Sequence, residues 1–157
     1  MQLASLLRLK QKSNEKTKIL LNVYDLSSNS FLSTVGLGIY HSGVEINGYE
    51  FSYSNAGITI STPGLFDQGQ FREQIELGTF ERDLYCLENI FVYLCEGDFR
   101  PGNYNIINNN CNHFTNTLST MLVDKEMPPW INRIAGLGYA LLPRSVYTAN
   151  KSQLDSP

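Results

Sequence analysis

The chain has few cysteines and histidines and no long apolar run. Three Cys and two His occur among 157 residues, which leaves few ligands for a metal site and argues against a disulfide framework. An odd, small number of cysteines without a secretory signal fits a reducing compartment. No segment approaches the roughly 20 apolar residues of a membrane helix, so we expect no integral membrane segment. Internal repeats and low-complexity linkers are also missing.

Charged residues are scarce and unevenly placed. They make up 17% of the chain, and the net charge of −3 argues against nucleic acid binding by bulk electrostatics. The first eighteen residues nevertheless carry a net charge of +4, from Arg8, Lys10, Lys12, Lys16 and Lys18 against Glu15. The remainder of the chain therefore carries −7. We expect residues 1–17 to form a basic, flexible arm. A weak membrane-surface or partner contact and a mitochondrial presequence remain alternatives for this arm.

The first half of the chain predicts strands. A run rich in β-formers at 17–25 is followed by a segment at 35–41 that continues through 43–46. Asn47-Gly48 is a hairpin signal, and 49–53 is its return strand. Further strands are predicted at 57–61 and 74–80, and a short, ambiguous one at 104–107. In 35–41, alternation places Leu37, Ile39 and His41 on one face.

The second half changes to helical spacing. Apolar residues recur with helical period between 83 and 96, with Asp83 as the N-cap and Gly97 as the end. A second amphipathic helix follows the run Asn108-Asn109-Asn110, and a last helix is expected at 130–138. Strands before helices predict an α+β fold. We expect one domain over 18–142 and a polar tail over 143–157.

Cys111 is the candidate nucleophile because it lies at the predicted start of a helix. The free N–H groups and the dipole at a helix N-terminus favour negative charge, which predicts a lowered thiol pKa. A nucleophilic cysteine needs a base. His113 is two residues away, about 200° around the helix, so it does not face the thiol. His41 is therefore the candidate base, against the simpler interpretation of a satisfied core histidine.

The other cysteines and histidine predict no second site. Cys111 and His113 have no matching second ligand pair, so we expect no metal and no cofactor. Cys86 and Cys95 lie within a predicted helix away from its N-terminus, and we interpret them as inert core or boundary residues. His113 is interpreted as a structural hydrogen-bonding residue.

Several blocks together resemble one known family. NNCNHF at 109–114 is similar to the cysteine motif of the PPPDE family of desumoylating isopeptidases, and GLGIYHSGVEINGYEFSYS at 36–54 resembles its histidine motif. VYDL at 23–26 and PPWINRIA at 128–135 resemble its first strand and last helix. The blocks occur in order across residues 18–140, which makes the resemblance more specific than one short motif.

This resemblance implies a permuted papain-like cysteine peptidase fold, with a small β-sheet or barrel packed against helices. It implies a Cys111–His41 dyad that cleaves SUMO, or a related ubiquitin-like modifier, from lysine of modified target proteins through a thioester. Members are intracellular, so cytoplasmic and also nuclear locations are expected, and homodimers occur. We expect His41 and Cys111 to lie within about hydrogen-bond reach. The oxyanion donors are expected to be the Cys111 N–H with an Asn109 or Asn110 side chain.

Three alternatives stay open at this stage. A deubiquitinase or a protein S-acyl thioesterase would use the same dyad, and a non-catalytic protein-binding module would keep the fold without the chemistry.

No third residue that orients His41 can be named, although Asp25 and Glu45 are candidates. Gly36, Gly38 and Gly43 around His41 favour an extended peptide tail over a bulky acyl chain, because a residue without a Cβ lets another backbone approach.

Overall fold

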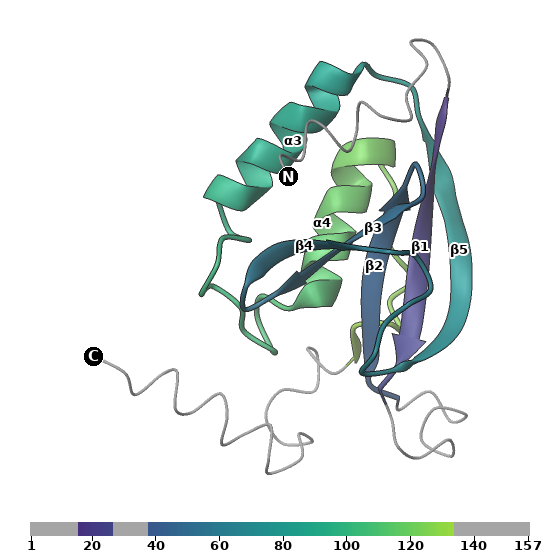
Figure 1. Ribbon diagram of the computed structural model, residues 1–157, viewed down its shortest axis with the longest axis vertical. Coiled ribbons are helices and arrows are strands. Elements are labelled where there is room, and N and C mark those ends of the chain that lie inside the picture. Colours follow the sequence, from purple (N-terminus) through teal and green to yellow (C-terminus); the bar gives the residue numbers. More distant parts are fainter. Residues whose placement is uncertain (1–15, 27–37, 134–157) are drawn as a thin grey trace.

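A computed structural model describes residues 16–26 and 38–133 of the chain. In this part, five antiparallel strands form one open sheet in the order β4-β3-β2-β1-β5, and two helices cover one of its faces (Figure 1). The elements are β1 (Thr17–Asp25), β2 (Tyr40–Ile46), β3 (Tyr49–Ser54), β4 (Gly57–Ser61), β5 (Gln70–Phe80), α3 (Leu84–Glu96) and α4 (Cys111–Val123). The predicted α+β class is confirmed, and the described sheet is not closed into a barrel.

The sheet separates an apolar face from a polar one. β1 pairs with β2 so that Val23 lies opposite Ser42 and Tyr24 lies opposite His41. Alternation then directs Val23 toward the helices and Tyr24 to the other face. The helix-facing side forms the core with α3 and α4, where Phe51 packs on Phe91 with ring centroids 4.6 Å apart. Strand alternation therefore fixes which side of the sheet each residue of β2 can serve.

Local signals explain most element boundaries. Asn47 and Gly48 adopt positive φ of 53° and 76°, as the tight turn between β2 and β3 requires. Asp83 caps α3 by accepting from the Cys86 N–H at 2.8 Å, and Gly97 ends that helix. These three predictions are confirmed.

Other predicted boundaries were wrong or fall outside the described residues. β2 begins at Tyr40, five residues after the predicted start, and residues 35–37 lie outside the described residues, with Gly36 and Leu37 among them. β5 begins at Gln70, four residues early. Residues 104–107 form no strand but a turn closed by a bridge between Asn105 and Asn109. Residues 130–132 form turns, and 134–138 lie outside the description, as do residues 1–15 and the tail.

One glycine is explained by a buried carboxylate. A Cβ on Gly43 would lie 2.4–2.8 Å from the side chain of Glu50, which is 2% exposed. Gly43 lies on the polar face of β2, two residues beyond His41, so its missing Cβ makes room for Glu50 and not for a substrate. The prediction that Gly43 opens a cleft was therefore wrong.

Gly43→Ala should destabilise the fold by about 2–3 kcal/mol, because the new methyl must displace a buried carboxylate from its donors. Urea unfolding measures this loss. Gly102→Ala is the matched control, since that site has a positive φ of 81° but open space around the added Cβ, and should cost only about 1 kcal/mol. Equal losses would show that Glu50 does not require the glycine.

Candidate active site

The first turn of α4 is built by a reciprocal cap. Asn110 has an extended backbone and its Oδ1 accepts the N–H of His113 at 3.0 Å. The His113 ring returns the interaction by accepting the Asn110 N–H at Nδ1, at 3.1 Å. This capping box makes Cys111 the first residue of the helix, as predicted, and confirms that His113 is a structural hydrogen-bonding residue.

The helix start docks onto the edge of β2 that β3 does not cover. β2 pairs with β3 through Val44 to Ile46, so within the described residues its first half has no β3 partner. Asn112 occupies this place: its Nδ2 donates to the Tyr40 carbonyl at 3.0 Å, and its Oδ1 accepts the Ser42 hydroxyl at 2.6 Å. Asn112 is 4% exposed, so both bonds are shielded from water. Sequence reasoning gave Asn112 no role, although it lies inside the cysteine motif.

The Cys111 thiol lies among several donors next to this docked edge. The backbone N–H groups of Ser42, Asn112 and Cys111 itself, together with the Tyr104 hydroxyl, all favour the thiolate. Burial nevertheless outweighs them and raises the pKa of Cys111 above its usual range. The prediction of a lowered thiol pKa was therefore wrong in direction, because the side chain is enclosed as well as placed at a helix start.

His41 is held between aromatic rings on the other face of β2. Its ring stacks on Phe66 with centroids 4.1 Å apart and planes 9° apart, and Tyr24 lies 5.9 Å away. His41 is 7% exposed, and this burial lowers its pKa to about 4. At neutral pH the imidazole is therefore uncharged, which is the form that can accept a proton.

His41 and Cys111 lie at neighbouring positions along β2 but on opposite faces of the sheet, and no hydrogen bond joins them among the described residues. Cys111 contacts the Ser42 backbone, one residue from His41. The Cys111 thiol donates to Asn112 Oδ1 at 3.8 Å, and His41 Nε2 has no partner among the described residues. Catalytic hydrogen bonds are often absent until substrate binds, so the dyad stays a prediction.

The amides expected to serve as oxyanion donors are occupied elsewhere. Both N–H groups of Asn109 Nδ2 have acceptors, the carbonyls of Asp98 at 2.7 Å and Asn103 at 3.0 Å. Asn110 Nδ2 donates to the Ile106 carbonyl at 2.8 Å and to Asn132 Oδ1 at 3.0 Å. These amides fix the loop before α4. The donors close to the thiol are instead the backbone N–H groups of Ser42, Asn112 and Cys111 and the Tyr104 hydroxyl.

An apolar pocket opens beside Cys111. It is lined by Leu26, Ile39, Tyr40, Tyr104, Ile106 and Ile131, with the asparagines of the helix start and Cys111 itself. The pocket therefore joins the start of β2, the loop before α4 and the segment after α4.

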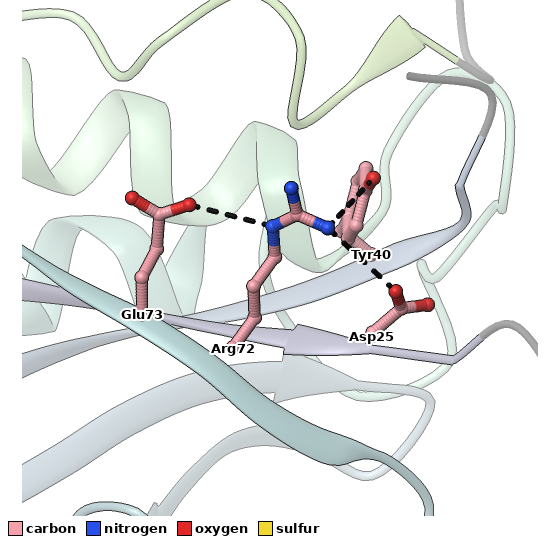
Figure 2. Close-up of polar contacts among 4 residues, drawn as sticks. All are labelled: Asp25, Tyr40, Arg72 and Glu73. Atoms are coloured by element: carbon pink, nitrogen blue, oxygen red, sulfur yellow. Dashed lines mark hydrogen bonds and ion pairs between the residues drawn. The ribbon is translucent and has the colours of Figure 1, made fainter. Parts of the chain in front are cut away.

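Tyr40 connects this pocket to β5. Arg72 reaches the Tyr40 hydroxyl at 3.4 Å and the Asp25 carboxylate at 3.8 Å, and its Nε lies 3.4 Å from Glu73. Figure 2 shows these contacts around the guanidinium. The guanidinium also lies 5.2 Å from the Tyr40 ring centroid and 5.3 Å from that of Trp130. This stack holds the segment that carries Ile131 against β2.

The candidate orienting acids are engaged away from His41. Asp25 pairs with Arg72, and Glu45 accepts from Asn22 at 3.3 Å and from Gln74 at 3.0 Å. The buried acid on the His41 face is Glu50, which sequence reasoning missed because a glutamate in a strand ordinarily faces water.

The described residues contain no group of three or more His, Cys, Asp or Glu suited to a metal ion. All three cysteines are free thiols. Cys86 is partly buried, as predicted, whereas Cys95 is exposed and so is no core residue. Within the same residues no helix has the length and apolar character needed to cross a bilayer.

The buried His41 should make the fold sensitive to acid. Its pKa is about 4 when folded and near 6.5 when unfolded, so the unfolded chain binds the proton first. Its contribution to stability is therefore complete above pH 6.5 and is lost as the pH falls toward 4. Between pH 7 and 4.5 the wild type should lose about 2–3 kcal/mol more than His41→Gln, measured by urea unfolding. Parallel losses would contradict a buried, neutral His41.

The chain is similar to known proteins over most of its length. Residues 17–147 match the family model described as "PPPDE putative peptidase domain". The chain is 37% identical over 135 residues to the desumoylating isopeptidase 1 homolog of Caenorhabditis elegans, covering 80% of this chain and 40% of that protein. It is 33% identical to a DeSI-like protein of Arabidopsis thaliana, with coverages of 88% and 65%.

A further relative is desumoylating isopeptidase 1 of Xenopus laevis, 34% identical over 140 residues, with 78% of this chain and 80% of that protein covered. The chain thus spans from two fifths to just under two thirds of the first two relatives. A family match over most of the sequence and a docked helix that begins at Cys111 lead to one conclusion. This chain belongs to the PPPDE peptidase family.

Proposed function

We propose that the protein is a cysteine isopeptidase that removes SUMO, or a related ubiquitin-like modifier, from lysine side chains through a thioester. The observation that carries this proposal is the placement of Cys111. The thiol lies at a helix start, surrounded by hydrogen-bond donors, and it contacts the backbone of Ser42, the residue that follows the base candidate His41. The names of the relatives supply the modifier class.

The first step transfers a proton and forms a thioester. Neutral His41 takes the Cys111 proton as the sulfur attacks the carbonyl carbon of the modifier's C-terminal glycine. Because burial raises the thiol pKa, proton transfer accompanies attack instead of preceding it. The carbonyl oxygen becomes an oxyanion that the Cys111 N–H and the Tyr104 hydroxyl can stabilise.

The remaining steps release both products. The protonated His41 donates its proton to the lysine Nζ as the C–N bond breaks, which frees the target protein and leaves an acyl-enzyme. His41 then takes a proton from water, and the hydroxide attacks the thioester carbonyl. The C–S bond breaks, the modifier leaves with a free carboxylate, and the thiolate recovers a proton from His41.

Electrophilic modifier tails should label Cys111 selectively. SUMO with a C-terminal vinyl sulfone should form one adduct with the wild type, none with Cys111→Ser, and at least tenfold less per minute with His41→Gln, because the base is lost. Cys95→Ser is the matched control: it removes the most exposed thiol and should label like the wild type. The measurement is a gel shift followed by mass spectrometry of the adduct.

Parallel substrates separate the alternatives. Labelling by the ubiquitin probe but not the SUMO probe would indicate a deubiquitinase. Hydrolysis of a palmitoyl thioester with no reaction toward either modifier would indicate the thioesterase, which the apolar lining beside Cys111 would suit. Absence of all these reactions from a folded protein would leave the non-catalytic binding module.

Gly38→Val should impair conjugate cleavage while leaving Cys111 open to small alkylating agents. A Cβ at Gly38 would lie 2.4 Å from the Tyr40 hydroxyl oxygen and 2.5 Å from the ring carbon that bears it, so the larger side chain must displace a ring that lines the pocket. We expect at least a tenfold loss of kcat/KM for a SUMO conjugate. Iodoacetamide labelling of Cys111 should change less than twofold, and an equal loss in both assays would contradict a substrate-binding role for this ring.

A further inference from the structure

Glu50 of β3 is a buried carboxylate that the proposed mechanism does not use. It is 2% exposed, and its Oε2 accepts three hydrogen bonds: from the Tyr24 hydroxyl at 2.5 Å, from Asn22 Nδ2 at 2.7 Å and from the Gly64 N–H at 3.3 Å. A carboxylate is buried in a protein only where its oxygens find donors. The absence of a Cβ at Gly43 gives its side chain room.

Two of these donors connect Glu50 to the loop between β4 and β5, residues 62–69. The Gly64 N–H reaches Glu50 and also donates to the Tyr24 hydroxyl at 3.0 Å. The loop is otherwise open to solvent, with Leu65 69% exposed. Figure 1 shows it crossing the face of the sheet away from the helices. Glu50 and Tyr24 therefore fasten an exposed loop to the polar face of the sheet.

The 62–69 loop places Phe66 against the His41 ring. Phe66, two residues after Gly64, stacks on the His41 ring at 4.1 Å and contacts Tyr24 at 5.3 Å between centroids. Tyr24 is also the cross-strand neighbour of His41. One side of the imidazole is thus covered by Phe66, whose position depends on the bonds to Glu50.

We propose that Glu50 is a positioning residue for His41, acting through Tyr24 and the 62–69 loop that holds Phe66 against the imidazole. By holding Phe66 in place, Glu50 and Tyr24 fix the ring plane of His41 and keep water from it. This inference rests on the proposed role of His41 as the catalytic base. It explains why an acid is retained in a buried position of β3, where an apolar residue would pack without needing donors.

The test measures the titration of His41 by NMR in the full chain. Only His41 and His113 give imidazole signals, and His113→Gln assigns them. If the loop covers the ring, Phe66→Ala should raise the His41 pKa from about 4 by one unit or more. Tyr24→Phe and Glu50→Gln should raise it by at least half a unit.

The sign distinguishes positioning from charge. A nearby anion stabilises the imidazolium. A purely electrostatic effect of Glu50→Gln, which removes that anion, would therefore lower the His41 pKa. The titratable groups on this face are Tyr24 of β1, Glu45 of β2 and Glu50 of β3. Asp67 follows Phe66 in the loop, and Cys111 of α4 lies on the other side of β2, beside Ser42. Tyr24→Phe keeps the ring and removes only the hydroxyl, so a fold that tolerates it keeps the proposal testable if Glu50→Gln does not fold.

Matched controls and an activity assay complete the experiment. Tyr85→Phe changes an exposed tyrosine on α3 and should leave the His41 titration unchanged, as should Glu76→Gln on β5. The acid limb of SUMO-conjugate cleavage should move upward with the His41 pKa in the positioning variants. A lower melting temperature with an unchanged His41 pKa would overturn the proposal. A raised His41 pKa in a protein that cleaves no modifier would support it and refute the proposed function.

Discussion

The candidate site depends on the docking of the first turn of α4 onto the half of β2 that β3 does not cover. Asn112 makes this joint by donating to the Tyr40 carbonyl and accepting from the Ser42 hydroxyl. A strand edge without a partner leaves backbone groups that need hydrogen bonds, and a helix start leaves free N–H groups. Joining the two satisfies part of each requirement and brings Cys111 beside β2. The capping box of Asn110 then fixes where the helix begins.

Burial sets the protonation state of this site more strongly than charge does. It raises the pKa of Cys111 and lowers that of His41, so both groups are neutral at physiological pH. A helix start and four donors favour the thiolate, yet they do not compensate for the loss of water. A resting thiol is less reactive toward small oxidants and electrophiles. The chemistry then depends on a substrate whose carbonyl accepts the sulfur as the base takes its proton.

Sequence patterns predicted what is local and failed where contacts are long-range. The Asn47-Gly48 turn, the Asp83 cap and the helix start after Asn110 were predicted correctly because turns and caps are decided within a few residues. The start of β2 was misplaced because pairing with β1 determines it. The thiol pKa was wrong because enclosure is a property of the packed fold. Glu50 was missed because its donors, Asn22, Tyr24 and Gly64, lie up to 28 residues away in sequence.

The register of β2 carries the site because the strand uses both of its faces. Ser42 faces the helices and bonds to Asn112, whereas His41 faces Tyr24 and Phe66. A slip of one residue would exchange these faces, burying the imidazole in the apolar core and taking the serine from Asn112. The pairs Tyr24–His41 and Val23–Ser42 forbid that slip. The same register places Gly43 opposite Asn22 and next to Glu50. The polar network of one face therefore fixes the base, and the helix docking on the other face fixes the nucleophile.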